Sequence, residues 1–412
     1  MSDVRDPLRL LRAAAAAREA AGLRRVLRPR TADCDGVIDL ASNDYLGLTR
    51  HPAVIEGAAA AVRRWGAGAT GSRLVTGSTD LHAQLERALA DFGGAEAGLV
   101  FSSGYLANLA VVTALASALA AGAGPAAGAG PAAGAGVLVV SDAANHASLV
   151  DACRLARARV AVVPHGDAGA VAAALAGRTE AAALVVTEGV FSVDGDLAPL
   201  AALHRVTREH GGLLVIDEAH ALGVLGPGGR GAAAAAGLAG QPDVVRTLTL
   251  SKSLAAQGGA VLGSAEVIQT LIDTGRSFIF DTGLAPPCAG AALAALGLLA
   301  ADPELGPRVR ASACRIAAEA ARLGLAASSP AAGVVSVILG EPDAALAAQR
   351  ICARHGVRAG CFRPPSVPAG RSCLRMATRA TLSERDLVTV SRALSAVRDH
   401  VPVPVPAGRR PA

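Results

Sequence analysis

The stretch that decides the fold is Thr247-Leu248-Thr249-Leu250-Ser251-Lys252, a short apolar run that ends at a lysine. Lys252 is the only lysine in 412 residues, and the other 38 of the 39 lysine and arginine residues are arginine. Arginine can replace lysine wherever a positive charge is sufficient, but its guanidinium does not deprotonate in proteins. A lysine retained in such a chain indicates amine chemistry, such as a Schiff base with a carbonyl compound. The alternative is that one lysine survived by chance, and its surroundings decide between the two.

Length and composition restrict the class of protein. A chain of 412 residues can bury a large core and divide into two domains. Its net charge is +5, but the arginines are scattered, so we expect no nucleic-acid-binding surface. The seven cysteines contain no Cys-x-x-Cys pair and are odd in number, which favours reduced thiols in a cytoplasmic protein over a disulfide framework or a metal site.

Neither a secretion signal nor a membrane segment is expected. Residues 7–29 show helical periodicity with arginine on the polar side and lack the apolar core of a secretory signal. The uncharged run at 104–141 contains Pro125 and Pro131, so it is interpreted as a buried helix followed by a linker.

Apolar runs alternate with helical stretches from residue 80 onward, which is typical of an α/β fold with a mostly parallel sheet and helices on both faces. After about residue 290 the pattern changes to long helices with strands at 334–339 and 373–377, which indicates a smaller α+β domain. The strands expected in the larger sheet are 97–101, 137–140, 160–163, 183–186, 213–217, 248–250 and 260–262.

The expected domain organisation follows from these changes in pattern. Residues 1–50 supply a helix and a strand that join the small domain, 51–288 form the large domain, and 289–400 form the small domain. An Ala/Gly/Pro-rich insertion at 121–136 and the tail at 401–412 are low in complexity, and the tail is expected to be disordered.

Gly66-x-Gly68-x-x-Gly71 matches the dinucleotide-binding pattern, but we reject this interpretation. That fingerprint requires a strand immediately before it, and here a predicted helix at 52–64 precedes the glycines. A lone match of this kind has low specificity, so no dinucleotide site is predicted.

Polar side chains follow several of the expected strands, where ligands bind in open α/β sheets. Ser102-Ser103-Gly104 opens an apolar helix whose N–H groups favour a phosphate, although an ordinary helix cap explains it too. Asp217 ends a very apolar strand, where its carboxylate can keep a pyridine nitrogen protonated, cap a helix or form an ion pair. His146 follows another strand, where an imidazole can stack on a flat ring or be an ordinary loop histidine.

The combination of these groups is more specific than each group alone. A phosphate-binding helix start, a histidine, a strand-end aspartate and a unique lysine come in the order of a large domain that binds pyridoxal 5'-phosphate (PLP). With these segments the chain resembles the α-oxoamine synthases, PLP-dependent transferases of the aspartate-aminotransferase type, called fold-type I. The segments are SNDYLGL (42–48), GATGSRLVTGSTDLHAQLE (68–86), FSSGYLAN (101–108), NHASLVDACRLA (145–156), TEGVFSVDGDLAPL (187–200), VIDEAHALGVLGPGGRG (215–231), TLTLSK (247–252) and FRPPSVPAGRSCLR (362–375).

The resemblance implies roles for the residues that match the family pattern. The implied catalytic residues are Lys252, which would carry PLP as a Schiff base, His146, which would stack on the ring, and Asp217, which would face the pyridine nitrogen. The implied cofactor contacts also include Ser103, Gly104, Tyr105, Ser192, His220, Thr249 and, in the neighbouring subunit's site, Thr282. The implied substrate contacts are Arg24, Asn43, Ser366 and Arg375.

Three positions depart from the family pattern. Ser366 stands where threonine is usual, and Ser251 fills a position that is often glycine. Asp281 stands where serine is expected, and a carboxylate there is unfavourable beside a phosphate unless it turns away.

The stretch from Arg363 to Pro368 resembles the branch of the family that makes 8-amino-7-oxononanoate for biotin synthesis. The implied reaction is a decarboxylative condensation of L-alanine with a pimeloyl thioester of CoA or of acyl-carrier protein, in a homodimer with shared active sites. Three alternatives stay open: glycine or serine with another acyl-CoA, an aminotransferase or aldolase on the same fold, and a cofactor-binding subunit without activity.

Overall fold

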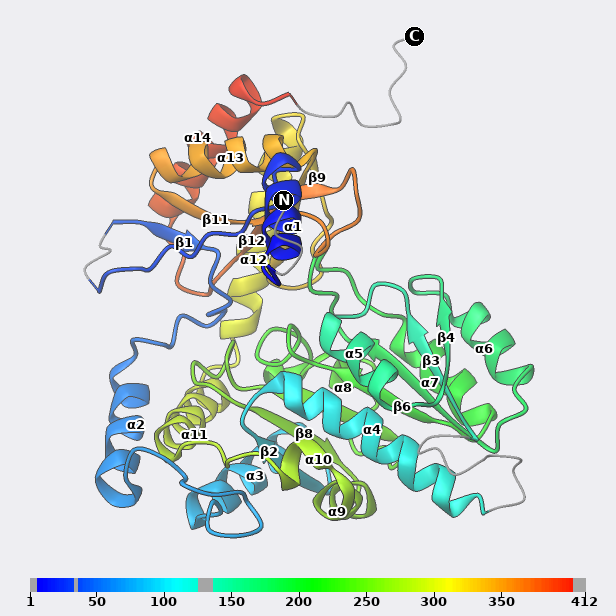
Figure 1. Ribbon diagram of the computed structural model, residues 1–412. Helices are drawn as coiled ribbons and strands as arrows, with labels where there is room; N and C mark the ends of the chain where they lie inside the picture. The colour runs from blue at the N-terminus through cyan, green and yellow to red at the C-terminus, as the bar shows by residue number, and fades with distance from the viewer. Residues whose placement is uncertain (1–5, 33–35, 125–135, 403–412) are drawn as a thin grey trace.

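Two β-sheets organise the protein in this computed structural model, which describes residues 6–32, 36–124 and 136–402 (Figure 1). The larger sheet has seven strands in the order β2-β8-β7-β6-β5-β3-β4. Within the described part of the chain, β8 alone runs against its neighbours in this sheet, so the predicted mostly parallel α/β fold is confirmed. The strands are β2 (Ala97–Phe101), β3 (Val137–Asp142), β4 (Arg159–Val163), β5 (Ala182–Glu188), β6 (Leu213–Asp217), β7 (Val244–Thr249) and β8 (Gly259–Gly263).

The strand predicted at 248–250 is displaced in the structure. Strand β7 begins at Val244 and ends at Thr249. It includes Arg246 and Thr247, which are buried although they are polar. A polar pair in the middle of a strand breaks the apolar run. The sequence pattern therefore located only the end of β7.

Helices cover both faces of this sheet. Alternate residues of each strand point to opposite faces, so each strand contributes to two cores. Leu214 and Ile216 of β6 pack into the core on one face, and Val215 packs into the core on the other. The first face carries α2 (Pro52–Trp65), α3 (Asp80–Gly93), α6 (Ala168–Ala176), α7 (Leu200–Glu209), α8 (Ala232–Ala235) and α11 (Pro286–Ala301). The second face carries α4 (Gly104–Gly122), α5 (Ala147–Leu155), α9 (Ala265–Thr274) and α10 (Arg276–Ile279).

Helix α4 is long and apolar enough to cross a membrane, as is the pair α11 and α12 (Leu305–Arg322) if counted as one span, although that pair is bent by 83°. The buried side chains of α4, from Ala107 to Ala116, belong to the core formed with β2, β3 and β5. Helix α4 therefore contributes its middle turns to the core on this face of the sheet.

The smaller sheet has five strands in the order β1-β11-β12-β10-β9 and its own core. Strand β1 lies parallel to β11, so the chain segment before residue 50 contributes an edge strand to this sheet. The strands are β1 (Ile38–Leu40), β9 (Ala326–Ala327), β10 (Val334–Gly340), β11 (Val357–Phe362) and β12 (Ser372–Ala377). The helices are α12 (Leu305–Arg322), α13 (Pro342–Arg354) and α14 (Glu384–His400).

The domain boundary predicted between residues 288 and 289 is wrong by one helix. Helix α11 packs against α2 and α3 and shares their core, whereas α12 packs against α14 and the smaller sheet. The alanine-rich composition of α11 matched the long helices that follow it, so sequence alone did not reveal which core it joins.

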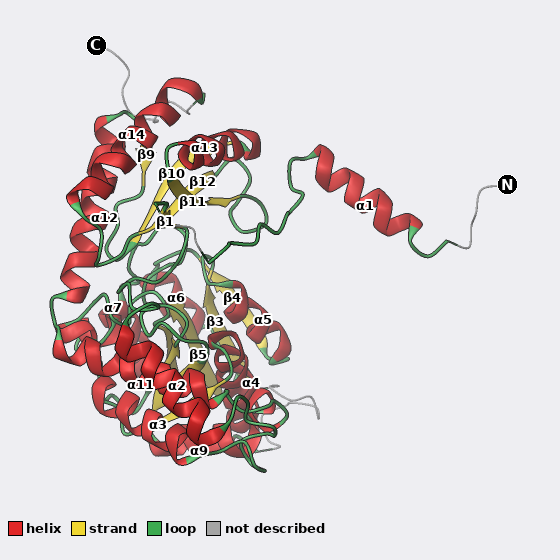
Figure 2. Ribbon diagram, turned by 90° about the vertical axis from the view of Figure 1, so that its left-hand side faces the viewer, coloured by secondary structure: helices red, strands yellow, loops and turns green. Residues whose placement is uncertain are grey.

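The predicted N-terminal helix at 7–29 is shorter in the structure. Helix α1 spans Arg9–Ala20, and the chain leaves it at Gly22, whose φ is +65°. Figure 2 shows α1 standing apart from both domains, and none of its residues is buried. Residues 125–135 of the predicted insertion and 403–412 of the predicted tail lie outside the described residues.

Candidate active site

A cavity of about 280 Å³ lies at the carboxyl ends of β5, β6 and β7, beside the first turn of α4. This is the edge at which ligand sites form in open α/β sheets. A larger cavity of about 610 Å³ between α4, α5 and α10 is lined by apolar, hydroxyl and arginine side chains, whereas carboxyl, histidine and lysine groups gather in the smaller one. The smaller cavity is lined by Ser103, Gly104, Tyr105, Asn108, His146, Ser148, Glu188, Asp217, Ala219, His220, Thr247, Leu248, Thr249, Ser251 and Lys252.

Lys252 enters this cavity from the turn after β7. Its Nζ lies 2.7 Å from His220 Nε2. Burial lowers the pKa of Lys252 to about 8 against the opposing charge of Asp217, and Arg375 adds to the lowering. About half of the amine is therefore neutral at pH 8, which is the form that a nucleophile or a base requires.

His220 connects Lys252 to a buried tyrosine. Its Nδ1 lies 2.6 Å from Tyr45 Oη, and its Nε2 faces the lysine. Burial, followed by the charges of Lys252 and Arg375, holds the pKa of His220 well below its usual range, so the imidazole is neutral. Tyr45 was missed because a single tyrosine followed by leucine is also the pattern of an ordinary core residue.

Asp217 is held at the end of β6 by two donors. Asn108 Nδ2 donates to its Oδ2 at 2.7 Å, and the backbone N–H of Ala219 donates to its Oδ1 at 2.8 Å. The Asn108 side chain is fixed in turn by Thr247, whose hydroxyl donates to Asn108 Oδ1 at 2.6 Å. Asn108 was also missed, although one amide in a helix as apolar as α4 is a signal that could have been used.

His146 caps the N-terminus of α5 and faces the cavity. The backbone N–H of Ser148 donates to its Nδ1 at 3.2 Å. Burial lowers the pKa of His146, and Lys252 and Arg375 act in the same direction against Asp217. The ring is therefore a neutral flat surface whose orientation is set by the helix cap.

The first turn of α4 forms the other wall of the cavity. Ser103 caps this helix by accepting a hydrogen bond from the N–H of Leu106 at 3.2 Å. A Cβ at Gly104 would lie 3.1 Å from Thr249 Cβ, so a larger residue would push the helix start and β7 apart by a few tenths of an ångström. Free N–H groups at a helix start bind an anion such as a phosphate, and the hydroxyl of Thr249 stands beside them.

Arg375 reaches the same region from β12 of the small domain. Its Nε donates to the Ser192 carbonyl at 2.6 Å, and its Nη1 donates to Asn43 Oδ1 at 3.0 Å. The guanidinium also stands over the Phe362 ring, with its Cζ 5.2 Å from the ring centroid. Among the described residues it forms no ion pair, so a buried cation is held by neutral acceptors and can take an external carboxylate.

Comparisons with known proteins agree with this arrangement. The aminotransferase class I and II family matches residues 35–394. The 8-amino-7-oxononanoate synthases of Mycobacterium avium and Mycolicibacterium smegmatis are 57% and 55% identical to this chain, covering 95% and 92% of it and 97% and 94% of their own lengths. Sphingomonas wittichii serine palmitoyltransferase has a TM-score of 0.85 at 28% identity, covering 97% of this chain and all of its own. The 8-amino-7-oxononanoate synthase of Francisella tularensis has a TM-score of 0.73 at 24% identity, covering 89% of this chain and 98% of its own, and shares the fold.

The chain belongs to the class I and II aminotransferase family, among the 8-amino-7-oxononanoate synthases. Members of this family depend on PLP, and solved serine palmitoyltransferases of the same fold hold it. The chain is thus a PLP-dependent transferase of fold-type I, as the sequence predicted.

The residues of the cavity fit the PLP of this family. Lys252 offers a neutral amine to the aldehyde, Asp217 a carboxylate to the pyridine nitrogen, and the first turn of α4 its N–H groups to the phosphate. In the part of the chain that the structure describes, no group of three or more His, Cys, Asp or Glu side chains could hold a metal ion.

Two predicted cofactor contacts of this synthase lie at the edge of the cavity. Tyr105 lines it, but its side chain is exposed and its hydroxyl donates to Asp151. Ser192 is connected to the site through its carbonyl, which accepts from Arg375. Their contacts with the cofactor stay predictions.

Two predicted substrate contacts, Arg24 and Ser366, do not line the cavity of their own subunit. Arg24 pairs with Glu19 at 2.7 Å, and both side chains are exposed. It is Arg25 whose guanidinium donates to Ser366 Oγ, at 3.3 Å. The N-terminal periodicity located a basic segment, but the neighbouring arginines of that segment cannot be distinguished by pattern alone.

Thr282 does not line the cavity of its own subunit. It forms an isolated β-bridge with Ser72. The neighbouring Asp281 accepts a hydrogen bond from the hydroxyl of Ser102, just before the α4 helix start. The unusual carboxylate at 281 is therefore satisfied locally. Whether Thr282 reaches a phosphate in a second subunit stays a prediction.

Proposed function

We propose that this protein condenses L-alanine with a pimeloyl thioester, releasing the thiol and CO2 and forming 8-amino-7-oxononanoate. The observation that carries the proposal is the buried Lys252 amine in this cavity, with the guanidinium of Arg375 close enough for its charge to lower the pKa of the lysine. Such a cavity holds a base and a carboxylate anchor together, as a reaction at the α-carbon of an amino acid requires. The names of the relatives support the product.

PLP would be held by three parts of the cavity. Lys252 would bind its aldehyde, the first turn of α4 with Thr249 would bind its phosphate, and Asp217 would hold the proton on its pyridine nitrogen. When bound, PLP supplies an electron sink for the bonds at the amino-acid α-carbon. His146 and His220 would fix the plane and the hydroxyl of the ring.

The chain's own residues perform the proton chemistry. Arg375, with Asn43 beside it, would bind the carboxylate of L-alanine and set the orientation of its α-carbon. Lys252 Nζ would take the Cα proton, because its lowered pKa leaves it neutral near the working pH. The same amine would return a proton after CO2 leaves.

The acyl donor is a thioester of CoA or of acyl-carrier protein. We place the reaction in the cytoplasm, where reduced thiols and these thioesters occur. A homodimer with shared active sites would place Thr282 near the partner's phosphate. The exposed Phe280, which is 70% accessible and precedes Thr282 by two residues, supports burial of this stretch against a second copy.

A second candidate is glycine or serine with another acyl-CoA. The likeness to serine palmitoyltransferases, at 28% to 29% identity over 95% of the chain, favours it among the alternatives. The two candidates differ in the amino acid and in the acyl chain, and both release a thiol and CO2.

The test is a visible absorption spectrum of the purified protein with PLP, followed by titration with amino acids and acyl thioesters. We expect L-alanine with pimeloyl-CoA or pimeloyl-carrier protein to give more thiol and CO2 than glycine or serine with any other acyl-CoA. Preference for glycine or serine would replace the first candidate by the second. Amino-group transfer without release of thiol would overturn both.

A further inference from the structure

Glu188 is a buried carboxyl group in the cavity that the proposed chemistry does not use. It ends β5 and is 2% exposed. In the parallel pairing of β5 with β6, Glu188 lies directly opposite Asp217. Paired residues of neighbouring strands point to the same face, so the two carboxyl groups lie at the same edge of the cavity.

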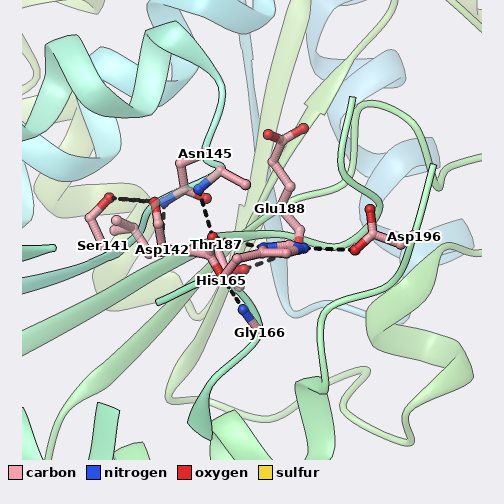
Figure 3. A network of polar contacts seen from close by, with 10 residues as sticks. Ser141, Asp142, Asn145, His165, Gly166, Thr187, Glu188 and Asp196 are labelled. Atoms are coloured by element: carbon pink, nitrogen blue, oxygen red, sulfur yellow. Dashed lines mark hydrogen bonds and ion pairs between the residues drawn. The ribbon is translucent and has the colours of Figure 1, made fainter. Parts of the chain in front are cut away.

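The two carboxyl groups differ in their hydrogen-bond partners. Asp217 receives donors on both oxygens, from Asn108 and from the N–H of Ala219. No donor among the described residues reaches Glu188 Oε1, although that atom is buried. Figure 3 shows the Glu188 side chain extending away from the polar network around Asp142 and His165. An unpaired buried oxygen at a cavity wall is a position for a ligand atom or for a group that donates its own proton.

The surroundings decide which of the pair is ionised. Burial raises the pKa of Glu188 well above its usual range, and the charge of Asp217 raises it further. Lys252 and the N–H groups of His146 and Ser192 oppose this rise without cancelling it. The other titratable groups near this pair are the His146 imidazole, Tyr45, His220 and Arg375. Two adjacent carboxyl groups in a buried site cannot both ionise readily, so the pair holds one proton.

We propose that Glu188 is a neutral carboxylic acid that donates a hydrogen bond to an oxygen atom of the bound reactants, while Asp217 carries the negative charge of the pair. The identity of this oxygen atom depends on the proposed function. The amino-acid carboxylate is assigned to Arg375, so the oxygen assigned to Glu188 is the carbonyl oxygen of the acyl thioester. That oxygen gains negative charge when carbon attacks the carbonyl, and a donor that keeps its proton stabilises it.

The protonation state can be tested without any turnover. The infrared carbonyl band of a protonated carboxylic acid should be present in the full chain at neutral pH, both before and after loading with PLP. Glu188→Gln should remove this band, and Glu209→Gln, at an exposed position of α7, should leave it unchanged. A wild-type chain without the band, or a band that survives in Glu188→Gln, would overturn the proposal.

Turnover tests the role as a donor. Glutamine keeps the size of the side chain and a donating N–H₂ group, so Glu188→Gln should stay within about threefold of wild-type kcat. Glu188→Ala lacks the donor and should lose about 100-fold in kcat, with KM for the amino acid nearly unchanged. In the wild-type protein kcat should fall at alkaline pH as the Glu188 carboxylic acid loses its proton, and Glu188→Gln should lack this fall.

Each outcome has a separate meaning. Equal loss of activity in Glu188→Gln and Glu188→Ala would show that the negative charge is required, which contradicts a neutral donor. If Glu188→Ala does not fold, as judged by circular dichroism, the infrared band and the pH profile of Glu188→Gln decide alone. If the wild-type protein releases no thiol from any acyl thioester, the proposed function fails, while the infrared result still decides the state of Glu188.

Discussion

Two clusters of buried charge stand one residue apart at the end of β6, and they are built in opposite ways. Glu218 accepts from the N–H groups of Ala232 and Ala233 at 2.7 and 2.9 Å and from Arg246 Nε at 3.1 Å. Arg246 uses its other nitrogens on the carbonyls of Gly93 and Arg230. Nothing in this cluster is left to react, and its side chains are at most 2% exposed.

The cavity cluster lies on the other side of β6, because Asp217 and Glu218 are consecutive and point to opposite faces. There a lysine meets one neutral histidine, and one carboxyl oxygen of Glu188 has no donor among the described residues. The comparison teaches that burial alone does not mark a reactive group. The five N–H donors of an arginine suit a cluster in which every polar group has a hydrogen-bond partner. The single amine of a lysine suits a cluster in which the hydrogen-bond partners change during a reaction.

Replacing the reactive amine should give the largest effect. Lys252→Ala and Lys252→Arg should both lower kcat by about 10⁴-fold, because neither side chain can exchange a proton near neutral pH. Thiol release measures kcat, and the visible absorbance of bound PLP measures the covalent link. Lys252→Arg is the matched control for charge, and activity in that variant would show that the amine is not required.

Breaking the satisfied cluster should destabilise the fold without changing the chemistry. Glu218→Gln should lower the free energy of unfolding by about 3–5 kcal/mol, since it leaves the buried Arg246 without its counter-charge. Urea denaturation measures the loss. The double variant Glu218→Gln, Arg246→Met should lose less than the sum of the two single variants. Additive losses would mean that the pair is not coupled.

Removing the carboxylate anchor should weaken substrate binding. Arg375→Ala should raise KM for L-alanine by about 10- to 100-fold, the range of a hydrogen-bonded contact with a charged group. Arg371→Ala is the control, because Arg371 pairs with Asp194 at the surface and should change KM less than twofold. Steady-state kinetics with varied amino acid decide this, and equal effects of both variants would contradict the assignment of Arg375.

The pH dependence of the single lysine should separate it from an exposed amine. With a pKa of about 8 rather than the usual 10.5, the neutral fraction of Lys252 should rise about tenfold between pH 7 and 9. Acylation of the cofactor-free chain by a small amine-reactive ester, followed by mass spectrometry of the Lys252 peptide, measures this rise. A rate that keeps increasing up to pH 10.5 would contradict the lowered pKa.

The smallest expected effect concerns the carboxylate at the phosphate-binding end. Asp281→Asn should strengthen PLP binding by about threefold, because it removes a negative charge near the α4 helix start without removing the partner of Ser102. Fluorescence titration with PLP measures the dissociation constant. Asp273→Asn, at an exposed position of α9, should have no effect, and weaker PLP binding in Asp281→Asn would reverse this interpretation.

The sequence predicted the large sheet well for a physical reason. Strands such as β6 are buried on both faces, so they read as continuous apolar runs that end at a polar residue. The same logic located Asp217 and Lys252 at the edge of the sheet where the cavity lies. Its failure at Arg246 has the same origin, because a fully paired buried arginine looks like a surface residue in the sequence.

What the sequence could not predict depends on contacts between distant segments. The position of Asn108 beneath Asp217 depends on how α4 crosses the sheet, and the pairing of Glu188 with Asp217 depends on strand register. The location of Arg24 depends on the path of the chain after α1, which the helical pattern placed inside a longer helix. Tyr45 joins His220 across 175 positions of the sequence, a distance at which no local pattern carries information.

Arg375 and Lys252 stand on different cores, one in the small domain and one in the large domain. An amino acid held by both would therefore bridge the two bodies with its own carbon skeleton. A slight tilt of the five-stranded sheet would lengthen or shorten that bridge, so side chains far from the cavity could tune which amino acid fits. The placement of the small domain would therefore set the length of amino acid that the cavity accepts.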